Sequence, residues 1–150
     1  MKPRILVAFD FGEPAGYALA WAADLNRALG CEPVHMVYAI DTRPAVVSES
    51  PAVTSMPGPA EIAGLERRMR EAARAAGVEA TVEVATKPQV ASATILEVAR
   101  RRRIELIVMG SHARRGIERL LLGSVAAHVA RGAECPVTTV YHPHVARVAR

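Results

Sequence analysis

Short apolar runs alternate with segments of helical periodicity along the chain, and this alternation limits the possible fold more than any other feature. The run from Ile5 to Phe9 is continuously apolar, which is typical of a strand buried on both faces of a parallel sheet. The clearest helical segment begins at Glu61 and ends at Gly77. Its apolar residues recur every three or four positions, as on one face of a helix: Ile62, Leu65, Met69, Ala72 and Ala76.

Alternation of strands and helices predicts an α/β fold. We expect strands over residues 5–9, 33–38, 78–84, 104–109 and 137–141. We expect helices between them: one opened by Pro14 and ended by Gly30, one over 61–76, one marked by Val90, Ile95 and Val98, and one over 124–131. The prediction is a doubly wound five-stranded parallel sheet, strand order 3-2-1-4-5, with helices on both faces. The sequence alone does not determine that order.

The length and composition favour one domain. With 150 residues, 51% of them hydrophobic, the chain can bury one sizeable core, and we predict a single domain over residues 1–150. Residues 41–60 are rich in Pro, Ser and Val without a period, and we expect a mobile loop beside the site or an insertion. The tail, 142–150, is expected to be disordered or to trim a subunit interface. No run reaches the roughly 18 apolar residues of a membrane span, so no membrane partner is expected.

Cysteine spacing and charge exclude several classes of function. Cys31 and Cys135 form neither a CxxC pair nor a metal-ligand spacing, so we expect unpaired thiols in a cytoplasmic protein. The net charge is +4, and four arginines stand at positions 100–103. That run falls at a predicted helix end, where cations favour the helix dipole, so a solvated helix end is the simpler interpretation. With 4% aromatic residues and none interleaved with the basic run, nucleic acid is not an expected partner.

The segment from Gly110 to Ser124 is built like a phosphate cradle. An apolar strand ends in Gly110, a short basic loop follows, and Gly123 and Ser124 open the next helix. Small residues let backbone N–H groups approach an anion, and a helix N-terminus adds partial positive charge. For an isolated pair of glycines, the simpler explanation would be that one ends a strand and the other begins a helix. If the strand order is 3-2-1-4-5, Asp10 at the end of the first strand faces the same crevice.

Ordered matches over nearly the whole chain resemble the universal stress protein family. The first strand and its exit, residues 5–13, and the second strand's ending, 35–37, are similar to the corresponding family segments. So are the fourth strand and its loop, 106–112, the Leu-Leu-Gly-Ser-Val segment at 121–125, and Cys-Pro-Val at 135–137. Each piece is weak by itself. In this order and spacing they are highly specific.

The resemblance implies an ATP site. Family members that bind ATP carry Gly-x2-Gly-x9-Gly followed by Ser or Thr, and Gly110, Gly123 and Ser124 match this pattern, whereas Ala113 replaces the middle glycine. Backbone N–H groups around the phosphates would come from Gly110, Ala113, Gly123, Ser124 and Val125. If the middle position needs a left-handed backbone, alanine would weaken binding by about one decade. If its Cβ meets a phosphate it would abolish binding, and in a right-handed loop it would cost little.

The other expected contacts also follow from the resemblance, and each has a structural alternative. Arg114 and its neighbour Arg115 could neutralise phosphate charge or form a solvated loop pair. Asp10 would accept hydrogen bonds from the ribose or hold Mg²⁺ through water, and it could also cap the following helix. The adenine slot would be lined by residues that could equally be plain core: Ala8, Phe9, Met36 and Met109.

These expectations lead to three functional hypotheses. The first is a cytoplasmic ATP-binding regulatory protein with at most slow ATP hydrolysis. The alternative is a stress protein whose pocket is closed by Ala113 and which acts by dimerisation or partner binding. A phosphoryl-transfer enzyme lacks support, because the chain has no P-loop lysine and no paired carboxylates beside the Gly loop, and no catalytic residue is assigned. The family implies a homodimer through the last strand, 137–141, a β-rich segment at a predicted sheet edge.

Overall fold

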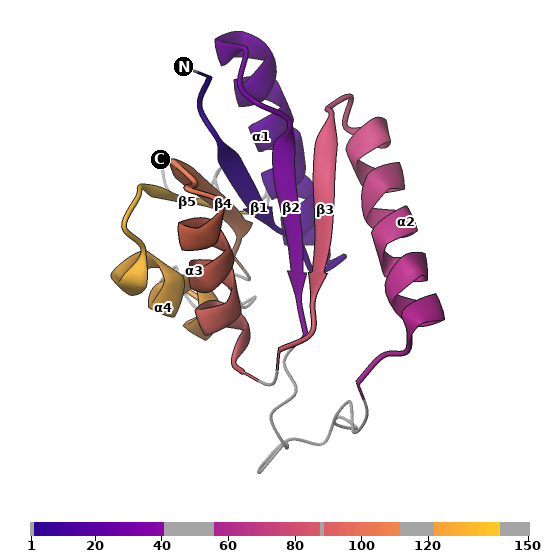
Figure 1. The fold of residues 1–150 in the computed structure, drawn as a ribbon. Coiled ribbons are helices and arrows are strands. Elements are labelled where there is room, and N and C mark those ends of the chain that lie inside the picture. The colour runs from indigo at the N-terminus through magenta and orange to yellow at the C-terminus, as the bar shows by residue number, and fades with distance from the viewer. Residues whose placement is uncertain (1, 41–55, 88, 112–121, 142–150) are drawn as a thin grey trace, which may run out of the picture.

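The computed structural model describes residues 2–40, 56–87, 89–111 and 122–141. In this part of the chain, strands and helices alternate as predicted (Figure 1). The elements are β1 (Ile5–Ala8), α1 (Glu13–Leu29), β2 (Val34–Ala39), α2 (Pro59–Ala75), β3 (Ala80–Ala85), α3 (Ala91–Arg101), β4 (Leu106–Gly110), α4 (Ser124–Gly132) and β5 (Val137–Val140).

The five strands form one parallel sheet in the order β3-β2-β1-β4-β5, which confirms the predicted fold class and strand order. From β1 the chain winds outward to β3, returns to β4 on the other side of β1, and ends at β5. The winding direction therefore reverses between β1 and β4. In this register Ala8 lies opposite Val37 on one side and opposite Met109 on the other. The carboxyl ends of β1 and β4 thus meet at the switch point.

Helices cover both faces of the sheet (Figure 1). One core packs α1 and α2 against the sheet and contains Leu19 and Met69; the other packs α3 and α4 and contains Ile95 and Val129. Successive side chains of a strand point to opposite faces, so β1 contributes to both cores. Each large apolar side chain buried in this way contributes about 1.5–3 kcal/mol to folding. Continuous apolar strands are the consequence of two covered faces.

Several element boundaries differ from the predictions because terminal residues are used by neighbouring elements. Ile104 was assigned to a strand, but its N–H donates to the Ala99 carbonyl and closes the end of α3. The N–H of Val78 likewise donates to Ala73 at the end of α2, so β3 begins two residues later. Helix α2 begins at Pro59, inside the predicted loop, and Glu61 accepts a hydrogen bond from the Gly58 N–H at 2.7 Å. Residues 41–55 and 142–150 lie outside the described residues.

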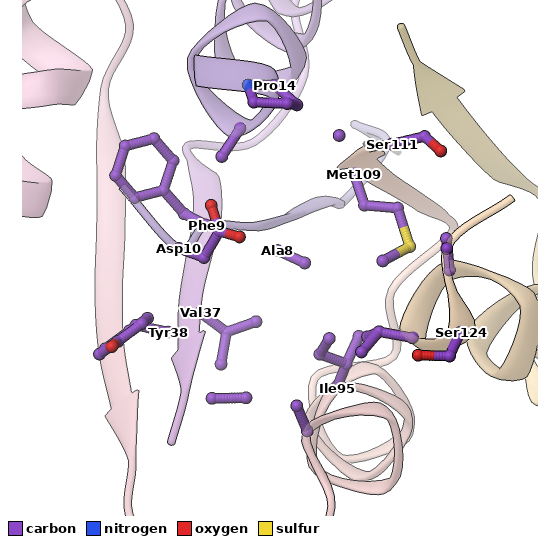
Figure 2. A pocket seen from close by; sticks show the side chains of 17 residues that line it. Ala8, Phe9, Asp10, Pro14, Val37, Tyr38, Ile95, Met109, Ser111 and Ser124 are labelled. Atoms are coloured by element: carbon purple, nitrogen blue, oxygen red, sulfur yellow. The ribbon is translucent and has the colours of Figure 1, made fainter. Parts of the chain in front are cut away.

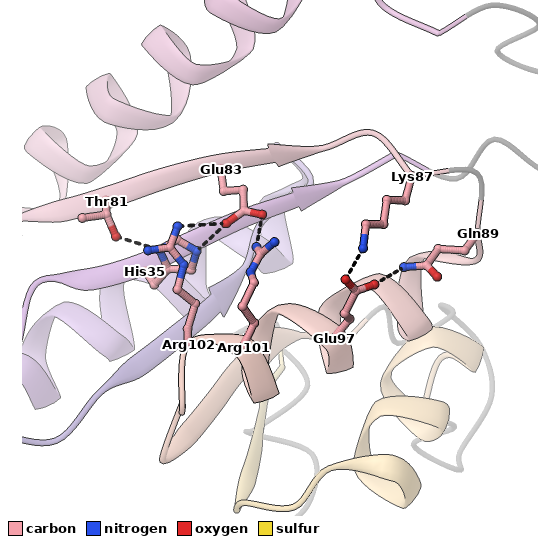
Figure 3. Close-up of polar contacts among 8 residues, drawn as sticks. All are labelled: His35, Thr81, Glu83, Lys87, Gln89, Glu97, Arg101 and Arg102. Carbon is pink, nitrogen blue, oxygen red and sulfur yellow. Dashed lines mark hydrogen bonds and ion pairs between the residues drawn. The ribbon is translucent and has the colours of Figure 1, made fainter.

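The arginine run lies at the exposed end of α3 as predicted, but it is ion-paired with described acidic residues (Figure 3). Arg101 and Arg102 both reach Glu83 on β3, Arg102 at 3.2 Å, and Arg100 lies 3.0 Å from Glu134. Glu97, on the same helix, binds Lys87 and accepts a hydrogen bond from Gln89 at 3.0 Å. Polar contacts therefore connect α3 both to the edge strand β3 and to residues between β3 and the helix.

Candidate functional site

A cavity of about 260 Å³ lies at the switch point, between the carboxyl ends of β1 and β4 (Figure 2). Asp10 and Ser124 lie on opposite sides of it, and the Met109 thioether points into it (Figure 2). Its wall is formed by the ends of three strands and the beginnings of three helices. The lining residues are Ala8, Phe9, Asp10, Pro14, Ala15, Val37, Tyr38, Ala39, Ala91, Ile95, Met109, Gly110, Ser111, Gly123, Ser124, Val125 and Ala126.

The cavity brings together most of the residues expected from the sequence, although they come from distant parts of the chain. The expected residues that line it are Ala8, Phe9, Asp10, Met109, Gly110, Gly123, Ser124 and Val125. Ala113 and Arg114 lie outside the described residues. Met36 is the expected residue that the structure places elsewhere.

Met36 is fully buried in the core under α1 and α2, and its neighbour Val37 lines the cavity instead. The reason is the two-residue period of a strand. Val37 lies in register with Ala8 and Met109, so these three side chains share the face that carries the cavity, while Met36 faces the opposite way. A strand that is apolar on both faces gives no sequence signal for which residue faces which side.

Sequence reasoning missed the contributions of α1 and α3. Pro14 and Ala15 begin α1, and Ala91 and Ile95 belong to the first turns of α3. The available signal was topological: in a parallel sheet every helix that follows a strand begins at the carboxyl edge.

Three helix N-termini border the cavity, and none is capped by a side chain. The N-cap residues of α1, α3 and α4 are Gly12, Val90 and Gly123, and each lacks a side-chain hydrogen bond to the first turn. The N–H groups of a helix's first turn have no partner within the helix, and the helix N-terminus carries partial positive charge. Among the described lining residues Asp10 is the only charged side chain. Any attraction for an anion from these residues therefore comes from the backbone.

The two glycines of the predicted cradle differ in their surroundings. A Cβ atom built on Gly110 would lie 2.4 Å from the Pro14 carbonyl carbon, so glycine is required there for α1 to cross β4 closely. A Cβ built on Gly123 would meet no atom within 4 Å. Gly110 therefore has a packing role, and Gly123 borders open space.

Asp10 closes the turn that leads into α1. Its Oδ1 accepts a hydrogen bond from the Gly12 N–H at 2.9 Å. Gly12 is itself the N-cap residue, so this hydrogen bond closes the turn that leads into the helix. Phe11, between them, adopts a left-handed backbone with φ of 64°. The carboxylate is exposed and faces the cavity (Figure 2).

The buried histidine belongs to a different part of the sheet. His35 Nδ1 lies 2.7 Å from the Thr81 hydroxyl, and Nε2 lies 3.3 Å from Glu83 (Figure 3). Burial lowers the pKa of His35, and the charge of Arg102 adds to this, while Glu83 acts in the opposite direction. None of these side chains lines the cavity. Within the described ranges no three His, Cys, Asp or Glu residues are grouped to hold a metal ion.

Two further expectations can be compared with the described residues. Both cysteines are free thiols, Cys31 buried and Cys135 half-buried, as predicted. Among the described helices none is long and apolar enough to cross a membrane.

An open parallel sheet whose winding direction reverses between β1 and β4 places the chain in the class of doubly wound α/β proteins. Within that class, the model of the Universal stress protein family matches residues 1–141, and the chain belongs to this family. The resemblance inferred from the sequence is thereby confirmed. None of the curated proteins matches the chain significantly.

Solved structures of this family share the fold. A universal stress protein from Archaeoglobus fulgidus is 23% identical with a TM-score of 0.71, covering 93% of this chain and 99% of that one. A universal stress protein from the same organism in complex with dAMP is 22% identical, with a TM-score of 0.65 and coverage of 92% and 97%. A universal stress protein in complex with cAMP is 24% identical, with a TM-score of 0.64 and coverage of 93% and 97%.

Proposed function

We propose that this chain is a regulatory protein that binds an adenine nucleotide, ATP in the first place, in the cavity between the ends of β1 and β4. The observation that carries the proposal is the meeting of three uncapped helix N-termini around one cavity at the switch point. Relatives of the same fold in complex with dAMP and cAMP support an adenine nucleotide as the ligand class.

The lining residues divide into a polar and an apolar part in this proposal. Backbone N–H groups at Gly123, Ser124 and Val125 would hold phosphate oxygens, with the Ser124 hydroxyl as a further donor. The row of Ala8, Val37 and Met109 would form one wall of the base slot.

Asp10 would accept hydrogen bonds from the ribose or hold Mg²⁺ through water, and the ion would offset phosphate charge. Ala113 and Arg114 would complete the phosphate contacts, as the family pattern implies. Met36 would not contact the nucleotide in this arrangement, because its side chain is fully buried on the other face of the sheet.

The same proposal includes the domain organisation, the localisation and the oligomeric state of the protein. We expect a single cytoplasmic domain over residues 1–150 that forms a homodimer through β5, acts as a regulator, and hydrolyses ATP slowly or not at all. Support for the dimer comes from the position of β5 at the edge of the sheet, where each of its residues is only half-buried.

The test is calorimetric titration of nucleotide-free protein with ATP and Mg²⁺, with AMP and cAMP in parallel. Binding heat together with a rise in melting temperature is expected, because a ligand of the native state stabilises it by mass action. If none of the three nucleotides gives heat or a thermal shift at millimolar concentration, the proposal is overturned.

A second candidate is suggested by Ala113, which stands where ATP-binding relatives have glycine. In this alternative the methyl group blocks the phosphates, and the protein acts by dimerisation or partner binding alone. The variant Ala113→Gly separates the two: ATP binding gained by the variant and absent from the parent favours the alternative. Equal binding by both favours the nucleotide site.

A further inference from the structure

The turn between β1 and α1 holds an unusual backbone conformation next to the cavity. Phe11 has φ of 64°, in the left-handed region that bulky residues rarely adopt. Such conformations persist only where the surrounding structure enforces them, and they gather at functional sites. In this turn Phe11 separates Asp10 from Gly12, whose N–H donates to the Asp10 carboxylate at 2.9 Å. The conformation of Phe11 thus sets the direction of the Asp10 side chain.

Three side chains surround the Phe11 ring and hold it. The ring packs edge-on against Phe9 with a centroid distance of 5.1 Å, and against Tyr38 at 5.5 Å. The guanidinium carbon of Arg68 lies 4.1 Å from the centroid of the ring. This is the geometry of a cation–π contact, which attracts the ring to a cation above its face. Helix α2 therefore contacts the turn that carries Asp10.

Arg68 differs from the neighbouring arginines of α2 in its partners. Arg67 lies 3.9 Å from Glu71 and Arg70 lies 3.1 Å from Glu66, each one helical turn away. Arg68 has Gly64 and Ala72 at those spacings and forms no ion pair with a described residue. Its guanidinium group lies instead over the Phe11 ring. The side chain is exposed, so filling the core does not explain its position.

We propose that Phe11 and Arg68 are positioning residues for the ligand site, with α2 holding the left-handed turn through the ring and the turn fixing the Asp10 carboxylate at the cavity. The inference rests on the proposed nucleotide site. It extends that site to a helix that contributes no described residue to the cavity wall. The competing explanation is that the ring and the guanidinium only stabilise the fold.

The experiment compares Arg68→Met with Arg68→Lys and with the matched control Arg67→Met. Methionine keeps an apolar stem and removes the charge, so ATP affinity is expected to fall about two- to fivefold, the value of an exposed cation–π contact. Lysine keeps the cation and should restore affinity to within about twofold. Arg67→Met, one residue away on the same helix, should bind ATP as the parent does. Calorimetric affinities and melting temperatures are measured for all four proteins.

A second readout does not depend on nucleotide. The hydrogen-exchange rate of the Gly12 amide, followed by nuclear magnetic resonance, reports the hydrogen bond to Asp10 directly. Arg68→Met should raise this rate about two- to fivefold, and Arg67→Met should leave it unchanged. If the parent binds no nucleotide, the proposed function fails, and the Gly12 amide still decides whether Arg68 positions the turn.

The double variant Phe11→Leu with Arg68→Met tests whether the two residues act together. If Arg68 acts through the ring, it should have no further effect once the ring is absent. The inference is overturned if Arg68→Met matches Arg67→Met in both ATP affinity and Gly12 exchange. It is also overturned if Arg68→Met has the same effect in the Phe11→Leu protein as in the parent. A lower melting temperature with unchanged affinity and unchanged Gly12 exchange would also overturn it, in favour of a purely structural role.

Discussion

Two glycines border the cavity, and the structure separates their physical roles. Gly110 allows the backbones of β4 and α1 to touch, whereas Gly123 leaves space open at the start of α4. The sequence pattern treats them alike, because a glycine needed for packing and a glycine needed for a ligand look the same in a motif. The distinction depends on where Pro14 lies, which is a tertiary property.

A methyl group added at each of these two positions should therefore affect a different property: stability at Gly110 and ATP affinity at Gly123. Gly110→Ala should lower the free energy of unfolding by about 1–3 kcal/mol, because the new Cβ overlaps backbone atoms of Pro14. Gly123→Ala should leave stability within about 0.5 kcal/mol and weaken ATP binding. Urea denaturation and calorimetric titration measure the two quantities. The added methyl group enters the open space beside Gly123, so full ATP affinity in Gly123→Ala would contradict the placing of the ligand against this residue.

His35 should make stability depend on pH. Its pKa is lowered in the folded protein, so as pH falls below the ordinary value of 6.5 the unfolded chain takes up a proton before the folded one. The free energy of unfolding should decrease, by at most about 1.4 kcal/mol per pH unit, until pH passes below the folded pKa. Urea denaturation between pH 8 and 5 should show this slope in the parent and a flatter one in His35→Gln. Equal slopes would mean that His35 does not titrate differently on folding.

At the level of elements, the order and type of every described helix and strand could be predicted, because apolar runs and helical periods alternate and two helices end at a glycine. Gly30 and Gly77 both adopt the left-handed backbone that ends a helix. The strand boundaries were wrong where one residue serves two elements, as Ile104 does when its N–H closes α3. Such sharing is decided by tertiary packing and leaves no periodic signal.

Helix α3 is connected to β3 by Glu83, whose side chain is 21% exposed, and to the loop after β3 by Glu97, which is 38% exposed. The more buried carboxylate should contribute more, because its ion pairs are less screened by water. Glu83→Gln is expected to lower the free energy of unfolding by about 1–2 kcal/mol at pH 7, and Glu97→Gln by less. Urea denaturation of the two variants gives the comparison. A larger loss for Glu97→Gln would contradict it.

For the whole molecule, the strand order places β5 at an edge. The N–H groups of Ile107 in β4 and of Ser111, just after it, donate to the carbonyls of Pro136 and Val140. The even-numbered residues of this segment therefore form the hydrogen bonds toward β4. The N–H groups of Val137 and Thr139 therefore point outward. In the proposed homodimer, these outward groups would pair with the same strand of a second copy.

Proline substitutions can distinguish the two edges of β5. Thr139→Pro removes an outward N–H and should convert a homodimer to a monomer without breaking the sheet. Thr138→Pro removes an inward N–H and should destabilise the fold instead. Light scattering at micromolar concentration measures mass, and thermal denaturation measures stability. A monomeric parent would contradict dimerisation through this strand.

The fold of the whole molecule could be predicted further than its site. The buried runs and their spacing are sufficient for a doubly wound sheet, and the family resemblance made the motif specific. The cavity wall could not be predicted fully, because Val37 and Ile95 reach it only through strand register and helix placement. In a strand that is buried on both faces, the sequence does not show which apolar side chain points to which face.

The uncapped beginnings of α1, α3 and α4 have a consequence for how the protein unfolds. These helices lie on opposite faces of the sheet, α1 on one and α3 and α4 on the other. An anion bound among their first turns would contact helices on both faces of the sheet at once. The bound ligand would then link the two helix layers, so that local unfolding of either layer at that edge of the sheet would require the ligand to dissociate.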